Sequence, residues 1–264
     1  MPRAVSIITV YYNAPDDLRN LYDSMQRQLP SVRYEFIVAD NHSEKDLSQE
    51  LPGVKYLRLP ENYGFAKANN IASQKARGEF LFFVNPDCIF IEDCLTPLLS
   101  VAKQTAIVAP KVLNPDQSIQ VSFGPTLSLW NEFRQRRLVK REATPRVQRW
   151  LKTQTSRPFS PDFVGGAALF IASAVFKELD RFDEKFFLYE EDVDLCERAR
   201  KLGHKILYFP SARIVHVRGT SASRNSTQVN KHYRQSHIYF YQKYRGGLQT
   251  FLLRIYLTFK FLFK

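Results

Sequence analysis

Cysteine is scarce in this chain of 264 residues, which contains only Cys88, Cys94 and Cys196. They form no CxxC pair and cannot all pair with one another, so the sequence favours a reducing compartment over a disulfide framework. No apolar run reaches the roughly 18 residues of a membrane-spanning helix, and the N-terminal run is interrupted too soon for a secretory signal. The chain also lacks GxGxxG and GxxxxGK[ST], which excludes a dinucleotide fingerprint and a P-loop.

Acidic residues are outnumbered as well, with 26 Asp and Glu against 38 Lys and Arg, which gives a net charge of +12. This balance favours an anionic partner: nucleic acid, a phosphate-rich ligand or an acidic membrane surface. The length allows one large domain or two small ones. We find no internal repeat and no low-complexity block.

The first half of the chain alternates β-branched apolar runs with amphipathic stretches. Strands are predicted at 5–10, 35–41, 54–60 and 79–85, and helices at 13–29 and 64–78. This alternation predicts an α/β fold with a mainly parallel central sheet flanked by helices. In such sheets ligands bind beyond the carboxyl ends of the strands. Polar residues follow several of these strand ends and favour a shared crevice: Asn13, Asp40, Asn41, Asn62, Asn85 and Asp87.

The stretch FFVNPDCIF, residues 82–90, puts a carboxylate in the most apolar part of the chain. Burying that charge without a partner would be costly. One interpretation is a tight turn, since Asn, Pro and Asp are turn residues. In the other, Pro86 keeps Asn85 extended, and Asp87 reaches the crevice mouth. There one carboxylate, with diphosphate oxygens and water, suits Mg²⁺ or Mn²⁺.

An acidic cluster precedes a predicted helix in the second half of the chain. Its members are Glu190, Glu191, Asp192 and Asp194. The structural interpretation is that acidic residues complement the dipole at a helix N-terminus. The functional interpretation is that the same geometry holds a carboxylate ionised and aimed outward, as a general base for a sugar hydroxyl requires.

Two other segments also leave both kinds of interpretation open. Residues 206–225 predict a strand, a turn, a second strand and a polar loop, in which His216 is structural or contacts metal or diphosphate. In the functional interpretation the loop binds an anion through Arg218, Ser221, Ser223 and Arg224. The pair Gly165-Gly166 predicts a tight turn into a core helix, or a backbone that approaches a substrate closely.

Taken in order, these motifs resemble those of family 2 glycosyltransferases, in the branch described as rhamnosyltransferase-like. The matching pieces are VSIITVYYN, IVADNHS, ENYGFAKANN, FFVNPD, FVGGAALFI, FDEKFFLYEEDVDLCERARKLG, VHVRGTS and HYRQSHIYFYQKY. The resemblance runs from residue 5 to about 246. It implies a GT-A catalytic domain over 1–226, with a nucleotide-sugar half over about 1–110 and an acceptor half over about 111–226. A C-terminal amphipathic helical region, 227–264, follows.

The resemblance also implies roles for individual residues. Those expected to bind the nucleotide sugar are Thr9, Tyr11, Asn13, Asp40, Asn41, Gly64, Phe65, Asn69 and Asn85, with Asp40 on the base. Asp192 is the expected catalytic base, paired with Glu191, and Glu190, Gly165 and Gly166 lie on the acceptor side. Arg218 is expected to bind diphosphate, and Asp87 and His216 to bind Mg²⁺ or Mn²⁺. Two departures are Asn85, in place of an acidic residue, and Ala68, where relatives often have Gly.

The implied reaction is inverting transfer of a sugar to a hydroxyl of a lipid-linked or polysaccharide acceptor. The branch suggests dTDP-rhamnose as the donor, and UDP-hexoses stay open. A rival of another class is a catalytically silent GT-A protein that recruits membrane partners. A second rival is a nucleotidyltransferase, which would normally carry a glycine- and basic-rich N-terminal signature absent here.

The last residues, 247–264, predict an amphipathic helix. One arc gathers the apolar side chains of Phe251, Leu252, Ile255, Tyr256, Phe259, Leu262 and Phe263. Leu253, Leu257 and Phe261 interrupt the polar side. The pattern predicts an interfacial helix with snorkelling basic residues, and hence a cytoplasmic protein peripheral to the inner face of the cell membrane. The alternative is packing on the catalytic domain or on a partner chain.

The middle of the chain is strongly basic, with Trp130 and Trp150 nearby. The basic residues are Arg134, Arg136, Arg137, Lys140, Arg141, Arg146, Arg149 and Lys152. A solvated charged face is one interpretation. Nucleic acid is not expected, because no recognised binding module accompanies the cluster. We expect an acceptor loop that meets anionic lipid or a lipid-diphosphate-linked glycan.

Overall fold

The computed structural model describes residues 5–30, 32–102, 105–218 and 226–262. Its main sheet contains β1 (Val5–Tyr11), β2 (Tyr34–Asp40), β3 (Lys55–Arg58), β4 (Phe80–Val84), β5 (Cys88–Ile89), β6 (Ile107–Leu113), β9 (Ala168–Ala172) and β10 (Ile206–His216). A second sheet pairs β7 (Phe123–Gly124) with β8 (Phe163–Val164). The helices are α1 (Pro15–Gln28), α2 (Gly64–Ser73), α3 (Leu95–Ala102), α4 (Leu129–Lys140), α5 (Pro145–Gln154), α6 (Ser173–Glu178), α7 (Glu191–Lys201), α9 (Ser226–Tyr244) and α10 (Gly246–Leu262).

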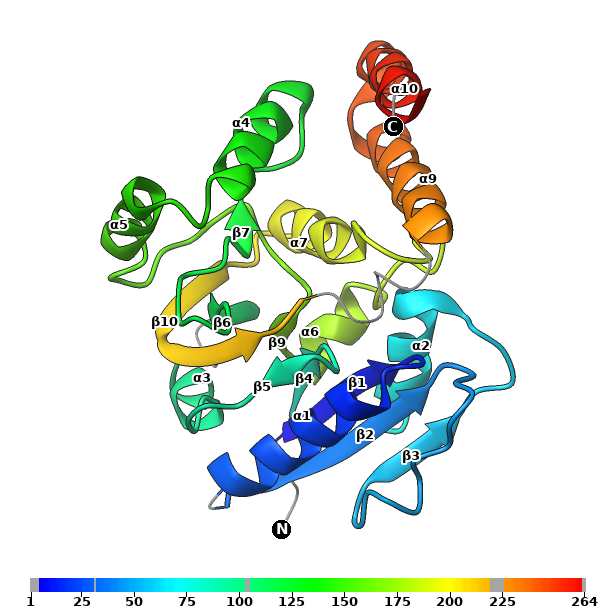
Figure 1. Ribbon diagram of the computed structural model, residues 1–264, viewed down its shortest axis with the longest axis vertical. Helices are drawn as coiled ribbons and strands as arrows, with labels where there is room; N and C mark the ends of the chain where they lie inside the picture. The colour runs from blue at the N-terminus through cyan, green and yellow to red at the C-terminus, as the bar shows by residue number, and fades with distance from the viewer. Residues whose placement is uncertain (1–4, 31, 103–104, 219–225, 263–264) are drawn as a thin grey trace.

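The main sheet has the order β3-β2-β1-β4-β9-β6-β10-β5. The first four strands run parallel, as do β6 and β10, whereas β9 and β5 pair antiparallel with their neighbours. The predicted alternation of strands and helices and the mainly parallel sheet are therefore confirmed. Helices flank the sheet, α4 and the α9–α10 pair project beyond α7 at the top of the view, and α5 lies at its left edge (Figure 1).

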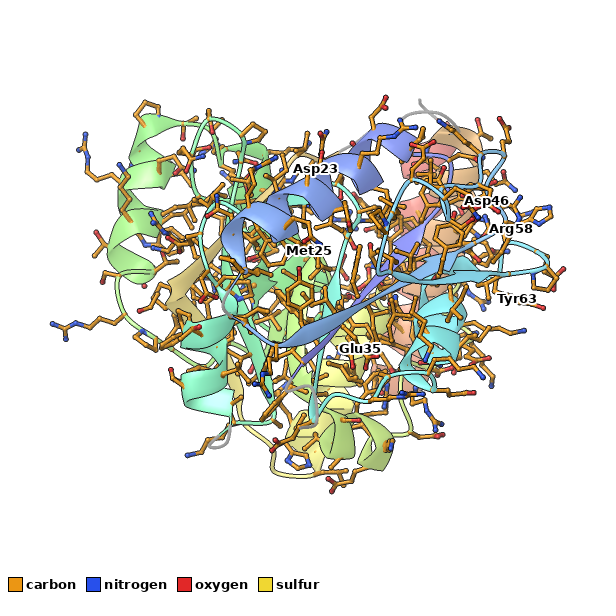
Figure 2. All side chains as sticks on the ribbon, turned by 90° about the horizontal axis from the view of Figure 1, so that it is seen from below. Asp23, Met25, Glu35, Asp46, Arg58 and Tyr63 are labelled. Atoms are coloured by element: carbon orange, nitrogen blue, oxygen red, sulfur yellow. The ribbon has the colours of Figure 1, made fainter. Side chains whose placement is uncertain are left out.

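Strand β1 shows why this sequence forms a two-faced sheet. Every residue of β1 is buried, and its apolar side chains alternate between two cores, Ile8 and Val10 in one and Val5, Ile7 and Tyr11 in the other. The second core also takes the inner face of α1 through Leu18, Leu21 and Met25. In Figure 2, Met25 and Asp23 lie on different sides of α1. Burying each such apolar side chain contributes roughly 1.5–3 kcal/mol.

Two predicted elements differ from the structure. The apolar run after Gly165-Gly166 is a strand, β9, and not a core helix. It inserts between β4 and β6, where both of its faces are covered by core side chains. Residues 206–216 form one strand and not two, because β10 continues through a register shift between Phe209 and Arg213 while it stays paired with β6.

The C-terminal helices α9 and α10 pack on the protein through a small third core. Phe240 and Tyr241 of α9 and Leu253 and Leu257 of α10 join Phe186 and Val193 there. The two leucines that interrupt the polar side of α10 are therefore its buried contacts. Phe251, Leu252, Ile255 and Tyr256, from the predicted apolar arc, stay exposed. Within the described ranges, the chain has no helix with the length and apolar character to cross a membrane.

Candidate active site

Asp87 lies in a tight turn that joins β4 to β5, as the first interpretation of this stretch predicted. Strand β4 ends at Val84, and the Asn85 N–H donates to the carbonyl oxygen of Ala167 at 2.9 Å. The Cys88 thiol donates to the same carbonyl at 3.3 Å. The turn is thus fixed to Ala167, the residue that follows Gly166.

His216 meets Asp87 because β5 and β10 pair antiparallel, with His216 opposite Cys88. The imidazole Nε2 lies 3.2 Å from Asp87 Oδ1, and both side chains are about 15% exposed or less. Its Nδ1 lies 2.7 Å from Oε1 of Gln120, a buried residue. The two predicted metal ligands, far apart in sequence, are therefore in direct contact.

Gln120 determines which ring nitrogen of His216 carries hydrogen. Its Nε2 donates to Asn114 Oδ1 at 2.9 Å and to the His216 carbonyl at 3.2 Å, so its Oε1 must accept from His216 Nδ1. Nε2 then faces the Asp87 carboxylate with a lone pair or a second hydrogen. Two electron-rich atoms this close need a cation between them, either a proton or a metal ion.

The donor set at Asp87 and His216 fits a divalent ion. Among the residues that the structure describes, no cluster of three or more His, Cys, Asp or Glu side chains could hold a metal. Two protein ligands are nevertheless enough where substrate phosphates and water complete the shell, as is usual for Mg²⁺. Gln120 and Asn114 would then orient the histidine from behind.

Asp192 is the second residue of α7, and backbone N–H groups hold its carboxylate. Its Oδ2 accepts from the Gly166 N–H at 2.6 Å, and its Oδ1 accepts from the Val193 N–H at 2.8 Å. Burial and then the charge of Glu190 raise the pKa of Asp192 to about 6, against the lowering effect of these bonds. A Cβ at Gly166 would lie 3.3 Å from Asp192 Cβ. The glycine therefore allows the backbone to approach the carboxylate.

Glu191 differs from its neighbour Asp192. It is buried, and its Oε2 has no hydrogen-bond partner among the described residues. Burial, followed by the charge of Asp192, raises the pKa of Glu191 well above its usual range. Burial thus favours the protonated form of Glu191 more strongly than that of Asp192, which leaves Asp192 as the candidate base of the pair.

The Asp87 turn and the Asp192 carboxylate are anchored to adjacent residues, Ala167 and Gly166. Asn85 binds the carbonyl of Ala167, and Gly166 donates its N–H to Asp192. Consecutive Cα atoms are about 3.8 Å apart, so both acidic groups lie at the same corner of the molecule. That the two carboxylates converge on one donor stays a prediction.

Asp40, predicted to contact the base of the donor, has all of its hydrogen bonds within the protein. This carboxylate is fully buried, and it accepts from the Ser43 N–H, the Tyr56 hydroxyl and Arg58 Nη1, all within 2.9 Å. Figure 2 shows Arg58 beside Asp46, to which it also pairs at 3.7 Å. Asp40 therefore organises the loop after β2 with its own side chain fully engaged.

Other predicted donor residues divide into buried and rim positions. The side chains of Thr9 and Tyr11 are inside the protein, where the Tyr11 hydroxyl donates to the Lys45 carbonyl at 3.0 Å. Asn13 lies at the rim with a φ of 51°, and its Oδ1 accepts from the Glu44 N–H at 2.8 Å. Ser43 Oγ accepts from the Asn13 N–H at 3.1 Å. Asn13 thus ties the ends of β1 and β2 together.

Asn41 and Gly64 join the donor side to the acidic segment. Asn41 donates to Asn62 Oδ1 at 2.7 Å and accepts from the Tyr63 N–H at 2.8 Å. Gly64 has a φ of +77°, and a Cβ there would lie 2.3 Å from the Phe187 carbonyl oxygen. The next N–H, of Phe65, donates to that carbonyl at 2.7 Å. Only glycine fits this contact.

Two predicted residues have structural partners that sequence reasoning missed. Asn69 is buried and donates to the Phe65 carbonyl at 3.0 Å within α2. Arg218 pairs with the buried Glu142 at 3.0 Å, so a diphosphate would have to compete with Glu142 for it. The remaining predicted anion contacts, Ser221, Ser223 and Arg224, lie outside the described residues.

Comparison with known proteins identifies the family. The family model described as "Glycosyl transferase family 2" matches residues 6–174. The chain belongs to glycosyl transferase family 2. It is 28% identical over 205 residues to the low-salt glycan biosynthesis hexosyltransferase Agl10 of Haloferax volcanii, which covers 75% of this chain and 62% of that protein. It is 24% identical over 247 residues to the N-acetylglucosaminyl-diphospho-decaprenol L-rhamnosyltransferase of Mycobacterium tuberculosis, covering 80% and 75%.

Solved structures place this family 2 chain in the GT-A fold. GalNAc-T7, crystallised with UDP, GalNAc and Mn²⁺, matches 91% of this chain and 50% of its own, with a TM-score of 0.66 and 21% identity. The TarS protein of S. aureus, residues 1–349, matches 88% and 65%, with a TM-score of 0.56 and 18% identity. The chain thus spans half of the GalNAc-T7 chain and about three fifths of Agl10.

The family 2 chain also contains a buried charged network that sequence reasoning missed. His237 of α9 lies 2.8 Å from Glu190 and 2.9 Å from Glu132 of α4, and all three are buried or nearly so. Burial opposes a charge on His237, but hydrogen bonds to Glu132 and Glu190 outweigh it and raise the pKa of His237 to about 9. A protonated imidazole therefore joins α4 and α9 to the start of α7.

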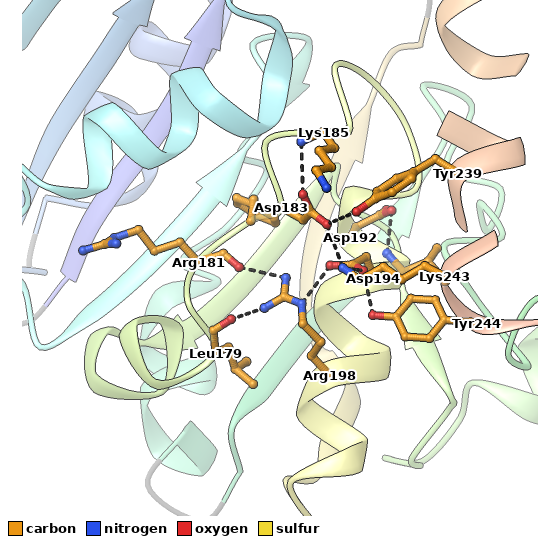
Figure 3. A network of polar contacts seen from close by, with 12 residues as sticks. Leu179, Arg181, Asp183, Lys185, Asp192, Asp194, Arg198, Tyr239, Lys243 and Tyr244 are labelled. Atoms are coloured by element: carbon orange, nitrogen blue, oxygen red, sulfur yellow. Dashed lines mark hydrogen bonds and ion pairs between the residues drawn. The ribbon is translucent and has the colours of Figure 1, made fainter. Parts of the chain in front are cut away.

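Asp194, the last member of the acidic cluster, is structural. It is fully buried and accepts from Arg198 at 2.8 Å, Lys243 at 2.6 Å and Tyr244 at 2.7 Å. Figure 3 shows these side chains converging from α7 and α9, with Arg198 also reaching the carbonyls of the segment before Asp183. The network holds α7 against α9 and so fixes the direction in which Asp192 points.

Proposed function

We propose that this chain is an inverting, metal-assisted glycosyltransferase that moves a hexosyl group from a nucleotide sugar to an acceptor hydroxyl. The observation that carries the proposal is the anchoring of two acidic segments to neighbouring residues, with the Asp87 turn bound to Ala167 and Asp192 bound to Gly166, while His216 lies beside Asp87. We assign catalysis to residues 1–226 and membrane attachment to residues 227–264.

In this mechanism Asp192 is the general base. The acceptor oxygen attacks the anomeric carbon, its proton passes to Asp192, and the bond from that carbon to the diphosphate oxygen breaks on the opposite face. A pKa of about 6 keeps the carboxylate ionised at neutral pH yet basic enough to take a proton. The N–H groups of Gly166 and Val193 hold it in one orientation.

Asp87 and His216 are proposed to receive the diphosphate side of the donor with Mg²⁺ or Mn²⁺. A bound divalent ion would neutralise charge on the leaving diphosphate. The role of Gln120 in this is testable without turnover. We expect Gln120→Ala to weaken Mn²⁺ binding in the presence of nucleoside diphosphate by roughly 10–100-fold, whereas the exposed control Gln49→Ala leaves it unchanged. Equal Mn²⁺ affinity in both variants, measured by electron paramagnetic resonance, would remove the assignment.

The donor is proposed to be dTDP-rhamnose, with a UDP-hexose as the alternative, and the acceptor a lipid-linked or polysaccharide glycan. Support comes from the relative named as a decaprenol-linked L-rhamnosyltransferase. The test is release of nucleoside diphosphate from a panel of nucleotide sugars. Release from dTDP-rhamnose well above that from the other nucleotide sugars supports dTDP-rhamnose as the donor. Release mainly from a UDP-hexose would assign that UDP-hexose as the donor. No release from any donor contradicts the proposed activity.

The chain is proposed to work on the cytoplasmic face of the membrane, bound through α10. Phe251 and Ile255 are 60% and 40% exposed, on the side of the helix away from its buried leucines. We expect Phe251→Ser with Ile255→Ser to abolish sedimentation with phosphatidylglycerol vesicles. The control pair Gln249→Ser with Thr258→Ser removes far less apolar surface and should still sediment. Sedimentation of the apolar-face variant at the control level would exclude this attachment.

A further inference from the structure

A groove between α4 and α5 lies outside the site described so far. It has a volume of about 960 Å³. Its apolar lining comes from the second sheet and from both helices: Phe123, Pro125, Leu138, Val147 and Trp150. One face of α4 supplies Asn131, Gln135 and Leu138 at helical spacing.

Three arginines edge this apolar groove: Arg134, Arg141 and Arg146. The groove has no carboxylate in its lining. Across the described ranges, none of the three arginines forms an ion pair. Arg136 and Arg218, by contrast, pair with the buried Glu132 and Glu142. An apolar channel with unneutralised guanidinium groups is complementary to an amphiphilic anion, since arginine binds phosphate oxygens in bidentate fashion.

The inner end of the groove adjoins the acceptor side of the candidate site. Phe123 follows Ser122, whose carbonyl accepts from the Gly165 N–H at 2.7 Å. The next N–H, of Gly166, donates to Asp192. A ligand in the groove therefore lies one strand away from the proposed base.

The other face of α4 fixes the helix and connects it to α10. Glu132 is its only buried side chain, held by His237, Tyr241 and Arg136. Arg136 also contacts the Tyr256 hydroxyl of α10. Through this contact α4, one wall of the groove, is joined to α10, whose exposed apolar face we propose to meet the membrane.

We propose that this groove binds the diphosphate and the first isoprenoid units of a prenyl-diphosphate-linked acceptor. The inference rests on the proposed function. The arginines hold the diphosphate, the apolar lining covers the isoprenoid, and the sugar attached to the diphosphate extends past the second sheet towards Asp192.

Trp150 provides a direct readout, because the chain has only one other tryptophan, Trp130. In a Trp130→Phe background, farnesyl diphosphate should change Trp150 fluorescence saturably at about 0.15 M salt, where charges more than about 8 Å apart are screened. Farnesol and inorganic diphosphate, each carrying half of the chemistry, should bind roughly tenfold or more weakly.

Two triple variants with equal loss of charge separate a built site from general attraction. Arg134→Gln, Arg141→Gln and Arg146→Gln should weaken farnesyl diphosphate binding roughly tenfold or more. Lys140→Gln, Arg149→Gln and Lys152→Gln, outside the groove lining, should change it less than about twofold. Equal weakening in both triples, or no saturable change with farnesyl diphosphate, would overturn the proposal. The proposal would also be overturned if a DNA duplex bound the parent more tightly than farnesyl diphosphate does and if both triple variants weakened that DNA binding.

The same proteins separate this proposal from the proposed function. Stabilisation by nucleoside diphosphate with Mn²⁺, followed as a thermal shift, should be the same in the groove triple and in the parent. If the parent protein shows no such thermal shift, the proposed glycosyltransferase activity is contradicted. The groove proposal would then still be tested by farnesyl diphosphate binding. A groove triple that retains full farnesyl diphosphate affinity would contradict the groove alone.

Discussion

The buried contact of His237 with Glu132 and Glu190 makes stability depend on pH. The folded pKa of His237 is about 9, against an ordinary value of 6.5. At about 1.36 kcal/mol for each pKa unit, this difference corresponds to about 3 kcal/mol. Because the folded pKa is raised, the stabilisation is fully present below pH 6.5. It declines as the pH rises and is lost above about pH 9.

Urea unfolding at several pH values measures this contribution directly. The free energy of unfolding of the parent minus that of His237→Gln, which cannot titrate, should fall by about 3 kcal/mol between pH 6 and pH 10. Gln49→Ala is the control, since it changes an exposed side chain that does not titrate, and its difference should stay flat. A flat difference for His237→Gln as well would refute the charged bridge between α4, α7 and α9.

Further predictions concern the glycine contact, the base and the tail. Gly64→Ala should destabilise the fold by about 3 kcal/mol in urea unfolding, through positive φ plus the clash with the Phe187 carbonyl. Gly53→Ala, with a φ of +78° and open space, should cost only about 1–2 kcal/mol, and equal losses would exclude the clash. Sugar transfer should rise roughly tenfold per pH unit below pH 6 and level above it, as Asp192 ionises, and a flat profile from pH 5 to 7 would contradict the base. Phe251→Ser alone should leave unfolding unchanged, because the side chain is exposed.

The fold could be predicted where local patterns and tertiary context agree. The β-branched apolar run of β1 is typical of a buried strand, and the apolar residues of α1 recur at helical spacing. The burial of both elements agrees with these patterns. The run that forms β9 was open to a helix, because a short apolar segment has no period that separates the two. Its pairing with β4 and β6 decided the outcome. In β10, Pro210 and Ser211 suggested a turn, but the strand absorbs them at a register shift.

The candidate site could be predicted only in part, for a related reason. Asp87, Asp192 and His216 stand in recognisable motifs. Gln120, which orients His216, lies 96 residues from it in sequence, and no local pattern marks it. His237 likewise acquires its charge from Glu132, 105 residues away. The hydrogen bonds that satisfy the buried Asp40 could not be predicted either, because two of its three donors, Tyr56 and Arg58, belong to a neighbouring strand.

The central claim is that Asp192 removes the proton from the acceptor hydroxyl. Asn at this position keeps one oxygen that can accept from the Gly166 N–H, while the Val193 N–H loses its side-chain acceptor. With the donor identified by the nucleotide-sugar panel, the rate of sugar transfer by Asp192→Asn should fall by at least about 100-fold, while its affinity for nucleoside diphosphate with Mn²⁺ stays within about threefold of the parent. Undiminished transfer at normal nucleotide affinity would contradict the account.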